Sequence, residues 1–102
     1  TVAINFPNPF NPDTGSTIIE FVQPVGVTVR GYLFSISGRL VRVLNDTNLA
    51  VGRAFATSGN SAYSWDGRDF NGAPVGNGVY LVHIINETAR TVLARGKILI
   101  VR

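Results

Sequence analysis

The 102 residues of the chain suit one domain with one hydrophobic core and leave no room for a second. Hydrophobic residues make up 45% of the chain and charged residues 15%, which excludes intrinsic disorder, and the absence of cysteine excludes disulfides, zinc–thiolate sites and thiol nucleophiles. The net charge of +3 is small and the arginines of the chain are scattered along the sequence. Because nucleic-acid binding requires a cluster of basic residues, we expect no nucleic-acid partner.

Alternation of apolar and polar residues, interrupted by turns rich in Gly, Pro, Asn and Asp, predicts an all-β chain. No apolar run approaches the roughly 18 residues of a membrane-spanning helix, so we expect no membrane-spanning segment. Short strands at this spacing predict an immunoglobulin-like antiparallel β-sandwich of about seven or eight strands. The candidate strands are residues 2–6, 17–22, 27–35, 40–45, 50–57, 61–65, 78–86 and 91–101.

Residues 1–16 are predicted to form a Pro/Asn-rich lead-in to a sandwich over residues 17–102. Three closely spaced prolines lack a backbone donor and push the preceding residues towards extended geometry, so we expect this lead-in to be extended and semi-rigid. Phe6 and Phe10 are predicted to anchor it on the sandwich. Because the chain starts with Thr1 and contains no methionine, we expect a single domain cut from a longer precursor.

The segment after the strand at residues 61–65 holds the densest turn chemistry of the chain. Asp66, Asp69 and Asn71 can cap free backbone N–H groups of a loop there, and glycines can supply positive φ angles. A bound cation is the alternative, although the spacing of these oxygen atoms fits a calcium loop poorly. The residues that we expect to shape this loop are Trp65, Asp66, Gly67, Asp69, Gly72, Gly78 and Tyr80.

The last two candidate strands predict an antiparallel hairpin. Arg95 and Lys97 are expected on its outward face, and we also expect the final strand to offer a free edge for docking. The residues predicted to share the opposite, inward face are Val92, Ala94, Gly96, Ile98 and Ile100.

The residue types available for chemistry point away from catalysis. His83 is the only histidine and shares a face with aliphatic residues, so we predict no catalytic residue, no metal site and no cofactor. The competing hypothesis is a carbohydrate-binding or structural accessory module of an extracellular glycoside hydrolase. In the carbohydrate-binding form, Tyr32, Tyr63, Trp65 and Tyr80 would form an aromatic platform for sugars. Packing of these rings in the core is the interpretation that we favour, because large aromatic side chains dominate small cores.

Several short motifs, taken in their order along the chain, give it a resemblance to a known family. The resemblance covers nearly the whole chain. They comprise Pro-Asn-Pro-Phe-Asn-Pro at 7–12, Thr-Ile-Ile-Glu-Phe at 17–21, Gly-Arg-Leu-Val at 38–41, Trp-Asp-Gly-Arg-Asp at 65–69, Gly72, Val75, Gly-Val-Tyr at 78–80, and Lys-Ile-Leu-Ile-Val-Arg at 97–102. In their order and spacing they resemble the C-terminal sorting domains of the type IX secretion system (the Por secretion system). That family is related to the immunoglobulin-like domain of the flagellar hook-capping protein.

The resemblance implies a non-catalytic sorting and cell-surface attachment module. Its expected partners are the outer-membrane secretion machinery, cell-surface components and a covalently linked upstream passenger, either a hydrolase or an adhesin. The expected localisation is secreted, at the cell surface or outer membrane, after passage through the periplasm. The recognition residues that the resemblance implies are Pro7, Asn8, Pro9, Phe10, Gly38, Arg39, Val41, Lys97, Ile98, Leu99 and Ile100.

Overall fold

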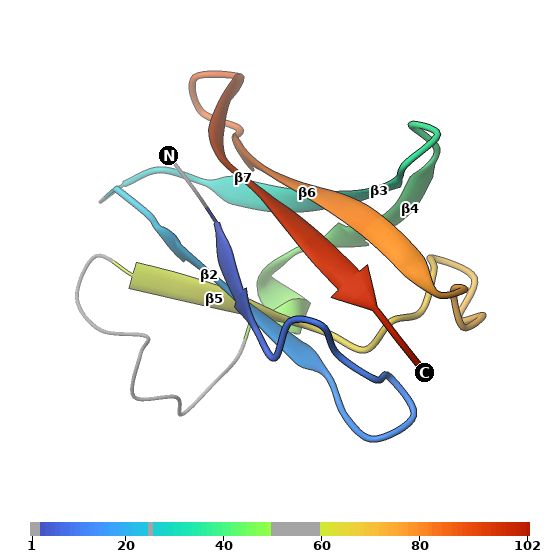
Figure 1. Ribbon diagram of the computed structural model, residues 1–102. Coiled ribbons are helices and arrows are strands. Elements are labelled where there is room, and N and C mark those ends of the chain that lie inside the picture. The colour runs from blue at the N-terminus through green and yellow to red at the C-terminus, as the bar shows by residue number, and fades with distance from the viewer. Residues whose placement is uncertain (1–2, 25, 50–59) are drawn as a thin grey trace.

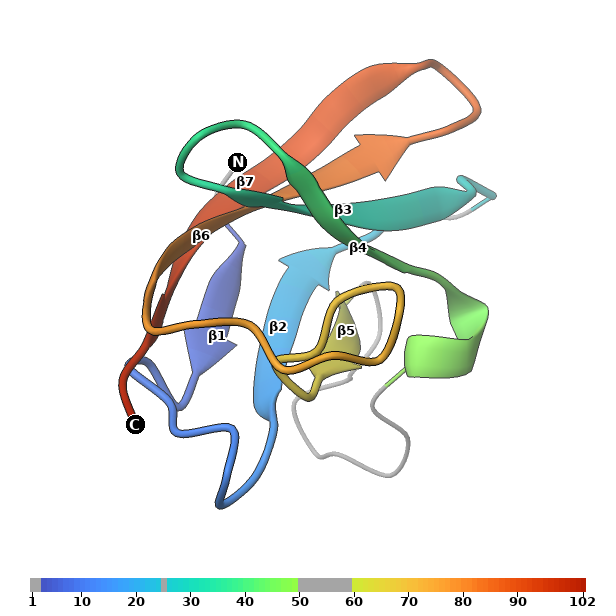
Figure 2. The same cartoon turned by 90° about the vertical axis from the view of Figure 1, so that its right-hand side faces the viewer.

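The computed structural model describes residues 3–24, 26–49 and 60–102, and in these residues seven strands form two antiparallel sheets that face one another (Figure 1; Figure 2). A short 3-10 helix, η1 (Asp46–Asn48), follows the fourth strand, and no helix in the described ranges is long and apolar enough to cross a membrane. The predicted all-β sandwich is confirmed. The three-stranded sheet has the order β1-β2-β5, with β1 (Ile4–Phe6), β2 (Thr17–Val22) and β5 (Asn60–Trp65). The four-stranded sheet has the order β4-β3-β6-β7, with β4 (Leu40–Leu44), β3 (Val29–Ser35), β6 (Gly78–Asn86) and β7 (Thr91–Ile100).

The core lies between the two sheets and takes buried residues from β2 to β7. Ile19 of β2, Leu33 of β3 and Ile84 of β6 have no solvent exposure. Burying a side chain of this size contributes about 1.5–3 kcal/mol to folding. Thr17 is buried with them, and its hydroxyl donates to the Pro7 carbonyl at 2.9 Å while accepting from the Asn5 amide at 3.1 Å. The sandwich therefore closes without leaving this buried hydroxyl unpaired.

The observed strands match the predicted ones over most of their length. β2 and β6 have the predicted bounds, whereas β1 starts at Ile4 and β3 at Val29, two residues later than expected in each case. The predicted strand at residues 50–57 lies outside the described residues.

A β-bulge interrupts the alternation at the start of β7. Ile84 pairs with Ala94 but Ile85 pairs with Val92, so Leu93 is the extra residue. Leu93 packs against the core, while Val92 is 41% exposed. The prediction that Val92 faces inward was therefore wrong, because the bulge shifts the side-chain alternation by one residue. Ala94, Ile98 and Ile100 are buried as expected.

The lead-in is built into the sandwich instead of preceding it as an extended arm. Its residues 4–6 form β1, which pairs with β2, and the chain then bends across to the four-stranded sheet through residues 7–10. The Phe6–Pro7 and Asn8–Pro9 peptide bonds are both cis. Phe10 is 3% exposed and serves as an anchor, but Phe6 is 78% exposed and does not. The strand alternation explains this difference, since Asn5 and not Phe6 lies opposite the buried Ile19.

Candidate recognition surface

The N-terminal segment runs along the outer edge of the final strand, β7. Asn8 supplies both sides of one contact: its amide nitrogen donates to the Lys97 carbonyl at 3.2 Å and its amide oxygen accepts the Leu99 N–H at 2.9 Å. Phe10 continues the pairing through its backbone, donating to the Leu99 carbonyl at 2.9 Å and accepting the Val101 N–H at 3.1 Å. A side-chain amide can replace a peptide group in this way because it carries the same donor and acceptor.

A second contact lies further up the same edge. The Ala3 N–H donates to the Arg95 carbonyl at 2.8 Å. A Cβ added at Gly96 would lie 2.5 Å from the Ala3 carbonyl oxygen, so glycine allows the two backbones to approach. The edge of β7 is thus already paired within the chain from Arg95 to Val101. The prediction that the final strand offers a free docking edge was therefore wrong.

Phe10 is held in a row of three aromatic rings. Its ring centroid lies 5.9 Å from that of Trp65, and the Trp65 centroid lies 5.6 Å from that of Tyr80 in an edge-to-face arrangement. The Trp65 indole N–H donates to the Arg68 carbonyl at 2.9 Å, so this fully buried ring keeps its polar atom paired. Gly67 has a φ of 76°, and a Cβ there would lie 2.6 Å from the Pro12 side chain. The row therefore joins the lead-in to the loop after β5.

Two aspartates fold that loop onto itself. The Asp66 carboxylate accepts the Arg68 N–H at 3.0 Å, and the Asp69 carboxylate accepts those of Asn71 and Ala73 at 2.9 and 3.0 Å. These bonds match the capping interpretation, although Asn71 contributes its backbone N–H and not its side chain. Within residues 3–24, 26–49 and 60–102, no group of three or more His, Cys, Asp or Glu side chains is placed to hold a metal ion.

The C-terminal arginine ties the end of the chain to the same loop. The Arg102 guanidinium donates to the Val75 carbonyl at 2.7 Å and pairs with Asp13 of the lead-in at 3.3 Å. Its backbone N–H donates to the Asn77 side chain at 3.1 Å. In both views the C-terminus lies beside the lead-in (Figure 1; Figure 2).

The turn between β3 and β4 reaches this end of the molecule as well. Gly38 adopts a φ of 89° in the turn, and Arg39 beside it is exposed. Arg39, Asp69 and Tyr80 are among the residues lining a shallow cleft of about 250 Å³. Burial raises the pKa of the Tyr80 hydroxyl, and the positive charges of Arg102 and Arg39 act against this rise. The hydroxyl donates to the Gly76 carbonyl at 2.7 Å.

Among the residues that the family resemblance singled out, the structure places Asn8 and Phe10 against residues 97–101, and it places Arg39 and Val41 at the cleft beside Tyr80. Only some of them are available to a partner. Phe10, Val41, Ile98 and Ile100 are buried and hold the fold. The exposed members of the set are Pro7, Asn8, Pro9, Gly38, Arg39, Lys97 and Leu99.

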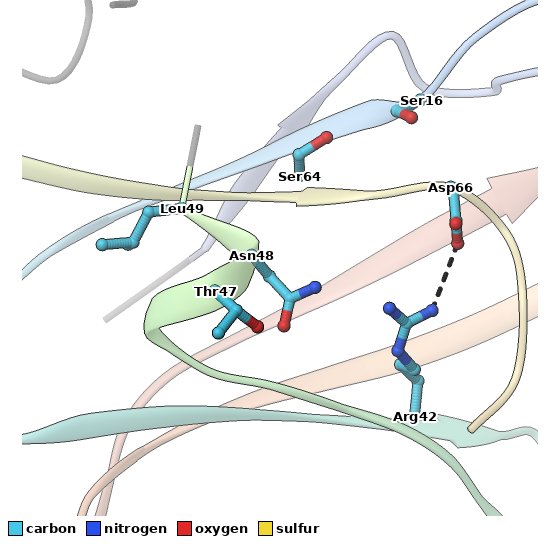
Figure 3. A pocket seen from close by; sticks show the side chains of 7 residues that line it. All are labelled: Ser16, Arg42, Thr47, Asn48, Leu49, Ser64 and Asp66. Atoms are coloured by element: carbon cyan, nitrogen blue, oxygen red, sulfur yellow. Dashed lines mark hydrogen bonds and ion pairs between the residues drawn. The ribbon is translucent and has the colours of Figure 1, made fainter. Parts of the chain in front are cut away.

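Sequence reasoning missed a polar cleft between β4, η1 and the end of β5, which Figure 3 shows. Arg42 and Asp66 form an ion pair of 3.2 Å in this cleft, whose volume is about 280 Å³. The other residues that line it are Ser16, Thr47, Asn48, Leu49 and Ser64. The available signal was a lone arginine within an apolar strand. Arg42 also donates to the Arg68 carbonyl at 3.1 Å, so it fixes the loop from the β4 side.

The proposed aromatic platform for sugars does not exist. Trp65 and Tyr63 are fully buried, and Tyr80 is 9% exposed. Only Tyr32 lies on an outer surface, where it pairs across strands with His83. The His83 ring packs against Phe34 with centroids 5.4 Å apart.

No family model matches the chain, and no curated protein matches it in sequence. Among solved structures, the chain is similar to PorZ, described as an essential bacterial surface component of the type IX secretion system of Porphyromonas gingivalis. The likeness has a TM-score of 0.64 at 17% identity and covers 98% of this chain. It covers 11% of PorZ, so the chain spans a small part of that protein's length. At this identity the likeness shows a shared fold.

Proposed function

We propose that this chain is a non-catalytic sorting and attachment module that directs an upstream passenger through the type IX secretion system to the cell surface. One observation carries the proposal: the first and last motifs, about 90 residues apart in the sequence, meet along the end of β7. The Asn8 side chain lies on β7 with both of its hydrogen bonds 89 to 91 residues distant in sequence. A contiguous surface of this kind can be read by a receptor without bond chemistry.

The shared fold with PorZ supports the same system, because PorZ is a surface component of type IX secretion. The loop carboxylates support a non-catalytic role as well. Asp66 and Asp69 accept hydrogen bonds from their own loop, and Asp66 also pairs with Arg42, so both are used in holding the fold. The proposed partners are the outer-membrane secretion machinery and cell-surface components.

The proposal is tested by removing residues 1–102 from the full-length precursor in its own host. We expect the intact precursor to reach the cell surface or medium and the shortened one to accumulate in the periplasm. Cell fractionation with antibodies against the passenger measures this. Activity or protease resistance of the retained passenger shows that it is folded. Equal surface delivery of the two proteins would remove the sorting role.

A further inference from the structure

The edge of β7 is paired with the N-terminal segment from Arg95 to Val101, so along these residues a partner meets the side chains on the face of the strand. The four-stranded sheet turns one side to the core and the other to solvent. We call the second side the outer face and define it by six outward-pointing residues of β3, β6 and β7: Tyr32, Phe34, Leu81, His83, Ile85 and Leu99.

The outer face is apolar and aromatic for the exposed side of a sheet. Its members on β3 and β6 are only half-buried, and Leu99 is 37% exposed. Cross-strand pairing makes it continuous, since Phe34 lies opposite Leu81 and Leu81 opposite Lys97. A contiguous exposed apolar surface of this kind marks an interaction site more often than scattered exposed side chains do.

The charges around the outer face have one sign. The strands β3, β4, β6 and β7 contain no aspartate or glutamate. Arg95 and Lys97 are exposed on β7 beside His83 and Leu81, and no described carboxylate lies within ion-pair distance of either. Glu87 lies just beyond β6, and Arg30 already neutralises it at 3.0 Å.

From this arrangement we infer that the outer face docks a protein surface with an apolar centre and carboxylates placed to meet Arg95 and Lys97. The inference rests on the proposed function and names the docking surface for the secretion machinery. Charge complementarity selects the occupant, because two unpaired cations at the margin of an apolar surface attract an acidic partner and disfavour a basic one. A second copy of the chain fits less well, since its own outer face has no carboxylate to offer.

The test reverses charge without touching the core. Arg95→Glu, Lys97→Glu and the double variant are introduced into the full-length precursor in its own host. Arg90→Glu is the matched control for a single reversal, because Arg90 is exposed in the turn between β6 and β7 and not on the outer face. We expect each reversal at Arg95 or Lys97 to reduce passenger at the cell surface, by about tenfold for the double variant, and Arg90→Glu to leave it unchanged. Thermal unfolding of the purified domains shows that all variants fold.

Two direct measurements on the purified domain separate the other occupants. Sedimentation reports self-association, and co-sedimentation with phosphatidylglycerol vesicles reports binding to an anionic lipid surface. A dimer or vesicle binding that the double reversal abolishes would assign the outer face to that occupant and overturn the inference. Normal export of the double variant would also overturn it while leaving the sorting role intact. Export of a precursor that lacks the whole domain would remove the proposed function and the inference together.

Discussion

Phe10 and Phe6 are identical side chains in the same short segment, and they have opposite environments. Phe10 is 3% exposed against Trp65, whereas Phe6 is 78% exposed on β1. We expect Phe10→Ala to lower the free energy of unfolding by about 3–5 kcal/mol, because it removes a buried ring and leaves a cavity. Phe6→Ala should change it by less than about 0.5 kcal/mol. Urea unfolding of the three proteins measures both values, and similar losses for the two variants would contradict this role of Phe10.

We expect the free energy of unfolding to depend on pH through the Tyr80 hydroxyl. Burial raises the pKa of its hydroxyl in the folded protein, whereas an unfolded tyrosine ionises near pH 10. Above about pH 10 the unfolded chain therefore loses this proton first, and the free energy of unfolding falls until the folded pKa is passed.

Tyr80→Phe tests this behaviour. The variant loses the hydrogen bond to Gly76, which costs about 1 kcal/mol at neutral pH, but it should show a smaller fall between pH 8 and pH 11 than the natural protein. Urea unfolding at several pH values measures the slope. An identical slope in both proteins would contradict the assignment to Tyr80.

At the scale of single residues, sequence reasoning worked where chemistry is local. Gly67, Gly72 and Gly78 adopt positive φ angles. Asp66 and Asp69 accept N–H groups a few residues away. Trp65 is fully buried, as expected of the one tryptophan at a strand end. The position of Phe6 was not predictable from its residue type, because it depends on which residue of β1 lies opposite Ile19.

Among the secondary-structure elements, the lead-in covers the outer edge of β7 by hydrogen bonding to it. Asn8→Ala removes both side-chain hydrogen bonds to this strand. We expect a loss of about 1–2 kcal/mol in the free energy of unfolding and at least about tenfold faster hydrogen exchange at the Leu99 amide. Asn71→Ala is the matched control, since the Asn71 side chain is exposed in the loop. Unchanged exchange at Leu99 would show that Asn8 does not close the edge.

Strand existence could be predicted from the sequence because alternation and turn residues are local signals. Two features of the elements could not. The bulge at Leu93 depends on the register between β6 and β7, and either Val92 or Leu93 fits an apolar inward position. The closure of the β7 edge depends on pairing between segments about 90 residues apart, which no local pattern encodes. Gly96 was the available hint, since a glycine inside a strand marks a close approach of another backbone.

Across the molecule as a whole, residues 10–13 of the lead-in and residues 101–102 form one surface with the loop between β5 and β6. Arg102 contacts both the loop and Asp13, and Phe10 and Val101 share a hydrogen bond. The motif residues could be named from the sequence, but their division into buried and exposed members required the fold. Ile98 and Ile100 hold the core, while Lys97 and Leu99, which alternate with them, face outward.

If this folded sandwich is sufficient as a sorting signal, it will carry an unrelated protein to the cell surface. In the direct test, the chain is fused to the C-terminus of an unrelated periplasmic reporter. The fusion is expressed in a bacterium with a working type IX secretion system and in an isogenic strain without one. Protease accessibility of the reporter on intact cells gives its location. We predict an accessible reporter in the first strain and a protected, periplasmic one in the second. A reporter that stays protected in both strains, while the attached domain is folded, would contradict the claim.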